Sequence, residues 1–336
     1  KKLHSMGVIP PTVHKIGLDS LTKRLLAPLP NKVNSSVFVI AVDGKVGDPL
    51  PEKQIRLMKL LDEHGLSYRL FSYENKNLIY SVSNHLVSSI QAVGGKPYIL
   101  NLPYPEDFSK GAFIGIDLGH SHRGSVDRFS NLAISLVDYQ GQHVLTLVKR
   151  LALNESPSFD HIEQCLTELI KQSESLLGYR LDKIIMLRDG FMGLQNSKNS
   201  HETIEKYKRV IKIPFTLLEF RKRGNPPLFA KKNNSIHPID AVAFGWGNDS
   251  VRLMNCYKPM TDNGLVRTFK VSLPRNAEGL GWGMDKYCQL IYGLCYSPSL
   301  GVKPHLPAPI YWADGIAKTS VRDHRFSGQR VIELNM

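Results

Sequence analysis

The chain has 336 residues, of which 42% are hydrophobic and 22% are charged. These proportions exclude an intrinsically disordered chain, and the length predicts two domains. The 43 lysines and arginines outnumber the 30 acidic residues and give a formal net charge of +13. This excess favours a polyanionic partner, most simply nucleic acid, with an anionic membrane surface or a merely basic protein as the alternatives.

The sequence contains no membrane or disulfide signature. Its longest apolar runs are far shorter than the ~20 residues of a bilayer-crossing helix, and its N-terminus has no apolar signal segment. The four cysteines form no CxxC pair and fit neither a zinc site nor a disulfide framework. We therefore expect buried free thiols, a cytoplasmic protein and no membrane partner.

Strand and helix signals alternate in the first part of the chain. Residues 1–35 contain several prolines and predict an N-terminal linker. The following region, 36–105, predicts two strands and two helices: Ser36–Val42, Pro51–His64, Tyr68–Tyr73 and Ile79–Val93. This alternation indicates a small α/β domain, with its boundary in the polar, proline-containing segment that precedes the second domain, 106–336.

The second domain begins with a different pattern. Three strands in a row are followed by an amphipathic helix and a further strand: Ala112–Leu118, Asn131–Asp138, His143–Leu151, Phe159–Leu177 and Lys183–Leu187. A strand over Ile213–Phe220 and a helix over Asp285–Leu294 come later. Three antiparallel strands, a crossover helix and a parallel strand are the topology of the RNase H-like fold.

Three aspartates lie on elements that the RNase H-like fold could bring close together. Asp117 lies inside an apolar strand, which is costly unless the charge is paired or metal-bound. Asp189 ends the strand expected beside it, and Asp314 lies in a late helical segment. Hydrolysis by two metal ions needs such carboxylates from different elements. Each residue also has a structural alternative, since Asp189 and Asp314 precede glycine as turn residues do.

Five segments in order along the chain resemble the MID and PIWI domains of the Argonaute family. They are SVSNHLVSSIQAVGGKPYIL at 81–100, IGIDLGHSH at 114–122, IIMLRDG at 184–190, FTLLEFRKRGNPPLF at 215–229 and YGLCYSPSLGVKPHLPAPIYWADGIAK at 292–318. The resemblance covers roughly residues 36–336. It implies a Rossmann-like MID domain over 36–105, which holds the 5′ end of a guide, and an RNase H-like PIWI domain over 106–336.

The resemblance also implies a catalytic tetrad and its metals. Asp117, Asp189 and Asp314 fill three of the four positions and are expected to bind two Mg²⁺ or Mn²⁺ ions. The remaining position, a glutamate on a loop, best matches Glu155 in LALNESPSF. Glu163 is the alternative, although it lies on the predicted helix.

The predicted binding site for the guide 5′ end departs from the family pattern. Ile55 and Lys59 stand where the family has a Tyr/Lys pair, and Ser88 and Ala92 stand where lysines are common. The remaining ligands that we expect are Lys59, Asn84, Lys96 and the C-terminal carboxylate of Met336.

Basic side chains of the PIWI part are expected to hold the backbone of a guide–target duplex: Arg188, Arg221, Lys222 and Arg223. The resemblance predicts a guide-directed endonuclease that defends against invading DNA. The alternative is a catalytically weak, guide-binding recognition subunit that acts with a partner effector. The PAZ and N domains of long Argonautes are lacking, so we expect an upstream segment, a partner protein or a short prokaryotic Argonaute. Whether guide and target are DNA or RNA stays open.

Overall fold

The computed structural model falls into two compact units, residues 1–76 and 77–336, which are described separately. It describes residues 37–42, 51–64, 66–72, 86–87, 89–91, 98–105, 107–120, 130–151, 157–190, 197–223, 225, 229–232, 235–238, 242–246, 248–255, 268–297, 306–318 and 331–334. Within these ranges, every helix is too short or too polar to span a lipid bilayer.

The first unit contains a strand–helix–strand motif. Strands β1 (Val37–Val42) and β2 (Ser67–Ser72) pair in parallel, and helix α3 (Glu52–Glu63) connects them, as parallel pairing requires. Leu57 and Leu61 of α3 pack on Tyr68 and Leu70 of β2. The three predicted elements are confirmed, whereas the 1–35 linker and most of the predicted Ile79–Val93 helix lie outside the described residues.

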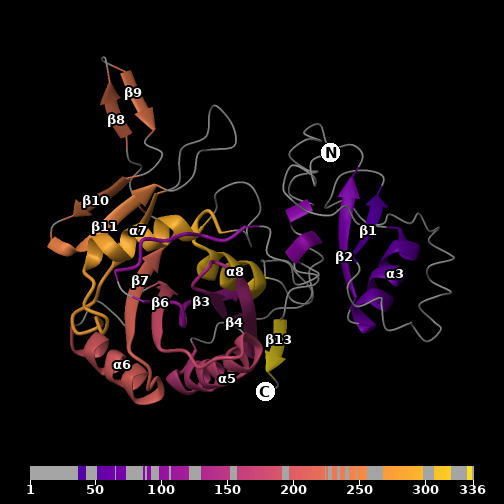
Figure 1. The fold of residues 1–336 in the computed structure, drawn as a ribbon, viewed down its shortest axis with the longest axis horizontal. Coiled ribbons are helices and arrows are strands. Elements are labelled where there is room, and N and C mark those ends of the chain that lie inside the picture. Colours follow the sequence, from indigo (N-terminus) through magenta and orange to yellow (C-terminus); the bar gives the residue numbers. More distant parts are fainter. Residues whose placement is uncertain are drawn as a thin grey trace. The chain divides into compact units, whose positions relative to one another are not determined.

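A nine-stranded sheet forms the centre of the second unit (Figure 1). Its order is β10–β11–β12–β7–β6–β3–β4–β5–β13. The strands span β3 Gly111–His120, β4 Ser130–Asp138, β5 His143–Leu151, β6 Lys183–Asp189, β7 Phe215–Arg221, β10 Val242–Trp246, β11 Asn248–Asn255, β12 Thr268–Ser272 and β13 Val331–Leu334. Strands β3, β4 and β5 are antiparallel neighbours, and β6 lies parallel to β3, which confirms the predicted RNase H-like topology. A separate hairpin joins β8 (Phe229–Lys232) and β9 (Ser235–Pro238).

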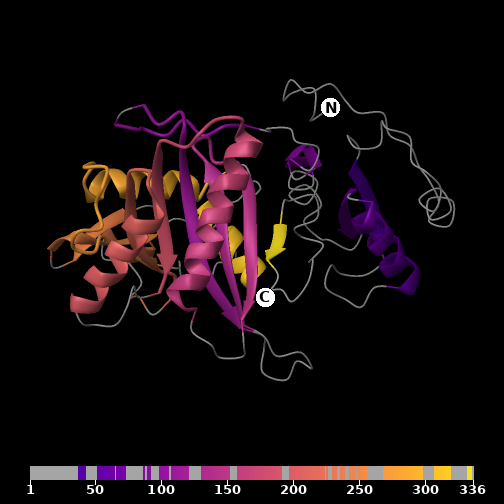
Figure 2. The ribbon, with the colours of Figure 1, turned by 90° about the horizontal axis from the view of Figure 1, so that it is seen from below.

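Helices cover both faces of this sheet (Figures 1 and 2). Helices α5 (Phe159–Leu177) and α6 (Ser197–Val210) lie on one face, and α7 (Met284–Leu294) and α8 (Ala308–Ala317) lie on the other. The bounds of α5 are those predicted, because Ser158 caps its first turn and Gly178, with φ 76°, ends it. Helix α6 and strands β8–β13 were not predicted.

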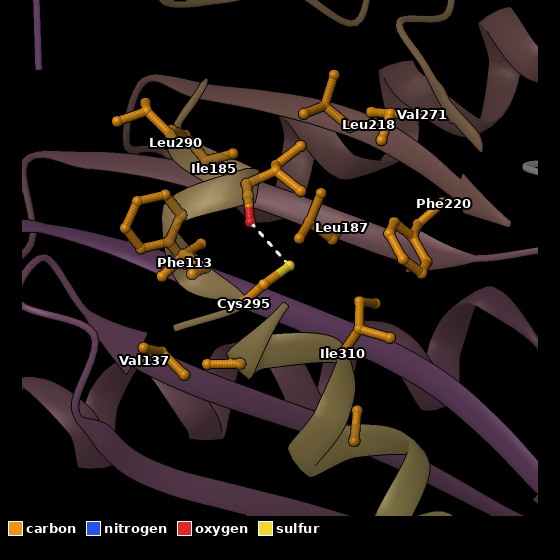
Figure 3. Packing of buried hydrophobic residues seen from close by; sticks show 14 of the residues in the cluster. Phe113, Val137, Ile185, Leu187, Leu218, Phe220, Val271, Leu290, Cys295 and Ile310 are labelled. Carbon is orange, nitrogen blue, oxygen red and sulfur yellow. Dashed lines mark hydrogen bonds between the residues drawn. The ribbon is translucent and has the colours of Figure 1, made fainter. Parts of the chain in front are cut away.

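The α7–α8 face has a continuous hydrophobic core (Figure 3). Side chains alternate between the two faces of a strand, so Phe113 of β3, Ile185 and Leu187 of β6 and Phe220 of β7 all point to this side. Cys295, just after α7, is buried among them and donates a hydrogen bond to the Ile291 carbonyl. The other described cysteines are also buried and free: Cys165 and Cys288.

Two glycines let helix α8 lie directly on β3. A Cβ atom on Gly115 would lie 2.1 Å from the Pro309 carbonyl oxygen, and one on Gly119 would lie 2.3 Å from that of Ala317. The cross-strand partners on β4 hold the same two carbonyls: Ser135 donates to Pro309, and Asn131 donates to Ala317. Helix α8 is thus fixed at both ends.

Residues 98–104 belong to the second unit and bond to the turn between β4 and β5. The Leu100 amide donates to the Gln140 carbonyl, the Gln142 side chain donates to the Tyr98 carbonyl, and the Tyr104 hydroxyl donates to the Tyr139 carbonyl. The compact units divide between Lys76 and Asn77, and the predicted domain boundary after residue 105 stays a prediction.

Substitution of Gly115 by alanine tests the close approach of α8. The new methyl group meets backbone atoms that cannot move without shifting the helix, so we expect a loss of about 1–3 kcal/mol in unfolding free energy, as for an overpacked core. Urea denaturation followed by tryptophan fluorescence, to which Trp312 of α8 contributes, measures it. Ile114→Val, on the opposite face of β3, is the control and should cost about 1 kcal/mol. Unchanged stability of Gly115→Ala would contradict the close contact.

Candidate active site

Three aspartates from three elements meet at one end of the sheet. The β3–β6 register pairs Ile116 with Arg188, so Asp117 and Asp189 are the next residues along two neighbouring strands. Asp117 lies between Gly115 and Gly119 on the face that α8 covers. Asp314 lies on α8 between the two anchored carbonyls of Pro309 and Ala317. The anchors therefore hold Asp314 near Asp117.

The three carboxylates share a single ammonium group, that of Lys222. Its Nζ lies 2.6 Å from Asp117 Oδ2, 2.6 Å from Asp189 Oδ2 and in direct contact with Asp314 Oδ1. The Asp117 side chain is 5% exposed and those of Lys222 and Asp189 are each 14% exposed, so this is a largely buried cluster. The structure thus brings together Asp117, Asp189 and Asp314, while their catalytic role stays a prediction.

Strand alternation explains why Lys222 reaches this site. Leu218 and Phe220 of β7 point into the α7–α8 core, and Lys222 is the next residue of the same parity, just beyond the strand. The β6–β7 register pairs Asp189 with Phe220, which places Lys222 beside the end of β6. From the sequence, Lys222 is expected to contact the duplex backbone. The structure directs its ammonium into the aspartate cluster, and contact with a duplex stays a prediction.

The cluster has an uneven distribution of charge. Burial raises the pKa of Asp117 to about 8, and the nearby Asp189 adds to this, while Lys222 opposes it. Burial alone would also raise the pKa of Asp314, but hydrogen bonds from Lys222 and Lys318 outweigh it and lower that pKa. The three carboxylates likewise outweigh the effect of burial on Lys222 and hold its pKa above the usual value. Lys222 is therefore charged, and Asp117 holds a proton more readily than an ordinary aspartate.

Lys318 is a second cation at the edge of the cluster. It lies one turn after Asp314 on α8, and its Nζ is 2.5 Å from Asp314 Oδ2. Its side chain is 41% exposed, so solvent weakens this pair. Lys318 thus forms an ion pair with one carboxylate at the exposed edge of the cluster, whereas Lys222 forms ion pairs with all three at its centre.

The donor set suits a divalent cation with hard oxygen ligands. Three carboxylates from separate elements already surround one positive charge, which is the coordination chemistry that Mg²⁺ and Mn²⁺ prefer. Across the described parts of the chain, no three His, Cys, Asp or Glu side chains are arranged as a metal cluster by themselves. The carboxylates fit the ion, and the ammonium of Lys222 lies among them.

The fourth position of the predicted tetrad has two candidates, Glu155 and Glu163. Glu155 lies outside the described residues. The alternative, Glu163, is exposed on α5, and α5 covers the face of the sheet opposite to Asp117. Glu163 is therefore separated from the aspartates by the sheet itself, which leaves Glu155 as the remaining prediction.

The other predicted binding residues have different surroundings. Arg188 follows Ile184 and Met186 in alternation and points to the α5–α6 face, where its guanidinium opposes the burial-driven rise in the pKa of Tyr207. Arg223 is exposed beyond β7, and Arg221 is half-buried. Among the residues predicted to hold the guide 5′ end, Lys59 is exposed on α3, and the rest lie outside the described residues: Asn84, Lys96 and Met336.

Three features of the site were not predicted, although a pattern in the sequence indicates each of them. The Gly115–Asp117–Gly119 spacing places both glycines beside the aspartate on one face, which signals a close approach of another backbone. Alternation from Leu218 through Phe220 predicts the face of the sheet on which Lys222 lies, but not its contact with the aspartates. The contact of Lys318 with Asp314 follows from their spacing of four residues on a helix.

Residues 74–324 match the Piwi domain family. The chain belongs to this family. Its members share the RNase H-like arrangement that the sheet shows, and the aspartate cluster lies within the matched region. No curated protein matches the sequence significantly.

Solved Argonaute structures share the fold of this Piwi protein. An Argonaute of Marinitoga piezophila in complex with a 5′-hydroxyl guide RNA has a TM-score of 0.58 and 19% identity, over 91% of this chain and 45% of the other. Clostridium butyricum Argonaute, bound to a guide DNA and a target DNA, has a TM-score of 0.63 and 14% identity, over 90% and 39%. Aquifex aeolicus Argonaute has a TM-score of 0.53 and 20% identity, over 90% and 42%. The chain spans less than half the length of these proteins.

The raised pKa of Asp117 predicts a pH-dependent stability. A carboxyl that titrates near 8 when folded and near 3.9 when unfolded opposes folding increasingly as the pH rises between those values. Asparagine cannot ionise, so metal-free Asp117→Asn should melt about 2–4 °C above the wild type at pH 8, with the difference vanishing towards pH 4. Thermal melts in EDTA across this range measure it, with Asp285→Asn, an exposed aspartate, as control. A difference that widens at low pH would contradict the assignment.

Proposed function

We propose that this Piwi protein is a guide-directed endonuclease that cleaves a target strand paired to a small guide. The observation that carries the proposal is the convergence of Asp117, Asp189 and Asp314 on one positive charge at the end of an RNase H-like sheet. The three carboxylates come from two adjacent strands and one helix. Such an arrangement is stable only if cations balance the negative charges.

The residues of this chain would hold the metal ions and position the target phosphate. Asp117 and Asp189 are held by paired strands, and Asp314 is held by the anchored helix α8, so the oxygen donors are preorganised. Mg²⁺ or Mn²⁺ bound by these carboxylates would activate water and stabilise the leaving oxygen in phosphodiester hydrolysis. Glu155 completes this set in the proposal.

The partners in this proposal are a guide and a target nucleic acid. The net charge of +13 supports a polyanionic partner, and related folds have been solved with guide RNA, with guide and target DNA, and with guide RNA and target DNA. In the proposal, exposed Arg223 contacts the duplex backbone. Residues outside this chain, from a longer polypeptide or a partner protein, supply the functions of the remaining Argonaute domains, and the biological role is defence against invading DNA.

A second candidate function is a guide-binding recognition subunit with little cleavage activity. The position of Lys222 favours it, because an ammonium bound to all three aspartates neutralises the groups that would hold a metal ion. In that case the chain would bind guide and target and act through a partner effector. Cleavage measured with both DNA and RNA guides separates the two candidates.

Replacement of Asp189 by asparagine tests the nuclease proposal. Loss of one carboxylate should lower the target cleavage rate by about a hundredfold or more, while guide affinity changes little, because this residue acts at the scissile phosphate. Single-turnover cleavage and guide titrations with Mn²⁺ measure the two effects. Asp285→Asn, whose side chain is 78% exposed on α7, is the matched control. Equal losses of guide binding and cleavage in Asp189→Asn would contradict this role.

The fourth position is tested by a pair of glutamate variants. Glu155→Ala should reduce cleavage strongly, because the proposal places this carboxylate at the metal ions. Glu163→Ala should leave cleavage within about twofold of wild type, since exposed surface substitutions change little and α5 covers the opposite face of the sheet. The same single-turnover assay compares them. The reverse order of effects would show that the tetrad is completed from α5.

A further inference from the structure

Lys222 is the centre of the aspartate cluster. A lysine ammonium has three N–H donors, and the structure provides three carboxylate acceptors, one each from Asp117, Asp189 and Asp314. One nitrogen thus supplies a hydrogen bond to each of the three side chains, and its positive charge balances the carboxylates that are ionised. The lysine therefore does for these carboxylates what a bound metal ion would do.

The ammonium and a metal ion cannot occupy this position together. The Lys222 nitrogen lies 2.6 Å from two of the carboxylate oxygens, and Mg²⁺ binds oxygen ligands at about 2.0–2.1 Å. Both cations therefore need nearly the same volume and the same oxygen atoms. An ion that binds these oxygens must first displace the ammonium.

Lys318 provides an internal comparison for this argument. Of the three aspartates it contacts Asp314, from the outside of the cluster, and its side chain is 41% exposed, against 14% for Lys222. Both residues are lysines that donate to the same aspartate. Only Lys222 lies where an ion shared by the carboxylates would bind.

We propose that Lys222 is a resident cation of the active site, which holds the three carboxylates together without metal and is displaced when a divalent ion binds. This inference rests on the proposed nuclease function, since it concerns the same site. Displacement uses part of the metal-binding free energy, so the wild-type protein binds divalent ions more weakly than its carboxylates alone would. The stability of the protein without bound metal depends on Lys222.

The experiment compares Mn²⁺ binding and metal-free stability in the full chain. Mn²⁺ affinity is measured by electron paramagnetic resonance of the free ion, and melting temperature is measured in EDTA. The test variant is Lys222→Met, Lys222→Gln is a milder second variant, and Lys318→Met is the matched control. Asp189→Asn added to Lys222→Met shows that the ion binds at these carboxylates, because it should abolish the gain in affinity.

We expect Lys222→Met to bind Mn²⁺ about tenfold more tightly than the wild type or better, and to melt about 5 °C lower in EDTA. Lys222→Gln should change both quantities in the same direction, and Lys318→Met should change Mn²⁺ affinity by less than about threefold, as for an exposed pair. A Lys222→Met protein that folds only with Mn²⁺ would support the proposal equally.

Two results would overturn it in distinguishable ways. If wild type, Lys222→Met and Lys222→Gln bind Mn²⁺ with equal affinity, or the variants bind more weakly, Lys222 is not the competitor, while the nuclease proposal stands. If none of these proteins binds Mn²⁺, both the resident cation and the metal-dependent function are wrong.

Discussion

The close contact between α8 and β3 is the constraint on which the site depends. Gly115 and Gly119 have no side chains, so the backbone of α8 can lie against the strand. Ser135 and Asn131 on the neighbouring strand donate hydrogen bonds to the two α8 carbonyls that lie over these glycines. Asp117 lies midway between the glycines, and Asp314 lies between the anchored carbonyls. Residues almost two hundred positions apart are thereby fixed without relying on long side chains, which lose more conformational freedom on ordering.

The same contact creates an electrostatic problem that the surrounding residues solve. It crowds carboxylates into a site where Asp117 is almost fully buried, so their mutual repulsion is poorly screened by water. Lys222 offsets this repulsion from inside the cluster, and Lys318 adds a weaker contribution at its edge. The apolar side chains beneath the site, such as Leu187 and Phe220, increase the need for such compensation, because they exclude water.

Prediction from sequence succeeded where a local pattern was strong. The amphipathic period of α5 predicted its bounds, and the apolar runs of β3 and β6 located Asp117 and Asp189 on adjacent strands. The short strands β8–β13 were missed, because four to eight residues provide little periodicity. The contact of Lys222 with the aspartates depends on the pairing of β6 with β7 and on packing of α8, which no single segment encodes. Glu155 lies outside the described residues and remains a prediction.

Strand β13 has a consequence for how this protein behaves in solution. It pairs in parallel with β5 from Val331↔Thr146 to Leu334↔Lys149, and its Ile332 and Leu334 pack on the α5 side of the sheet. Its four residues cover the hydrogen-bonding edge of β5, which would otherwise offer a template for a strand of another molecule. Weakening this short strand leaves the aspartates in place and exposes that edge, so damage there would appear as self-association of folded molecules.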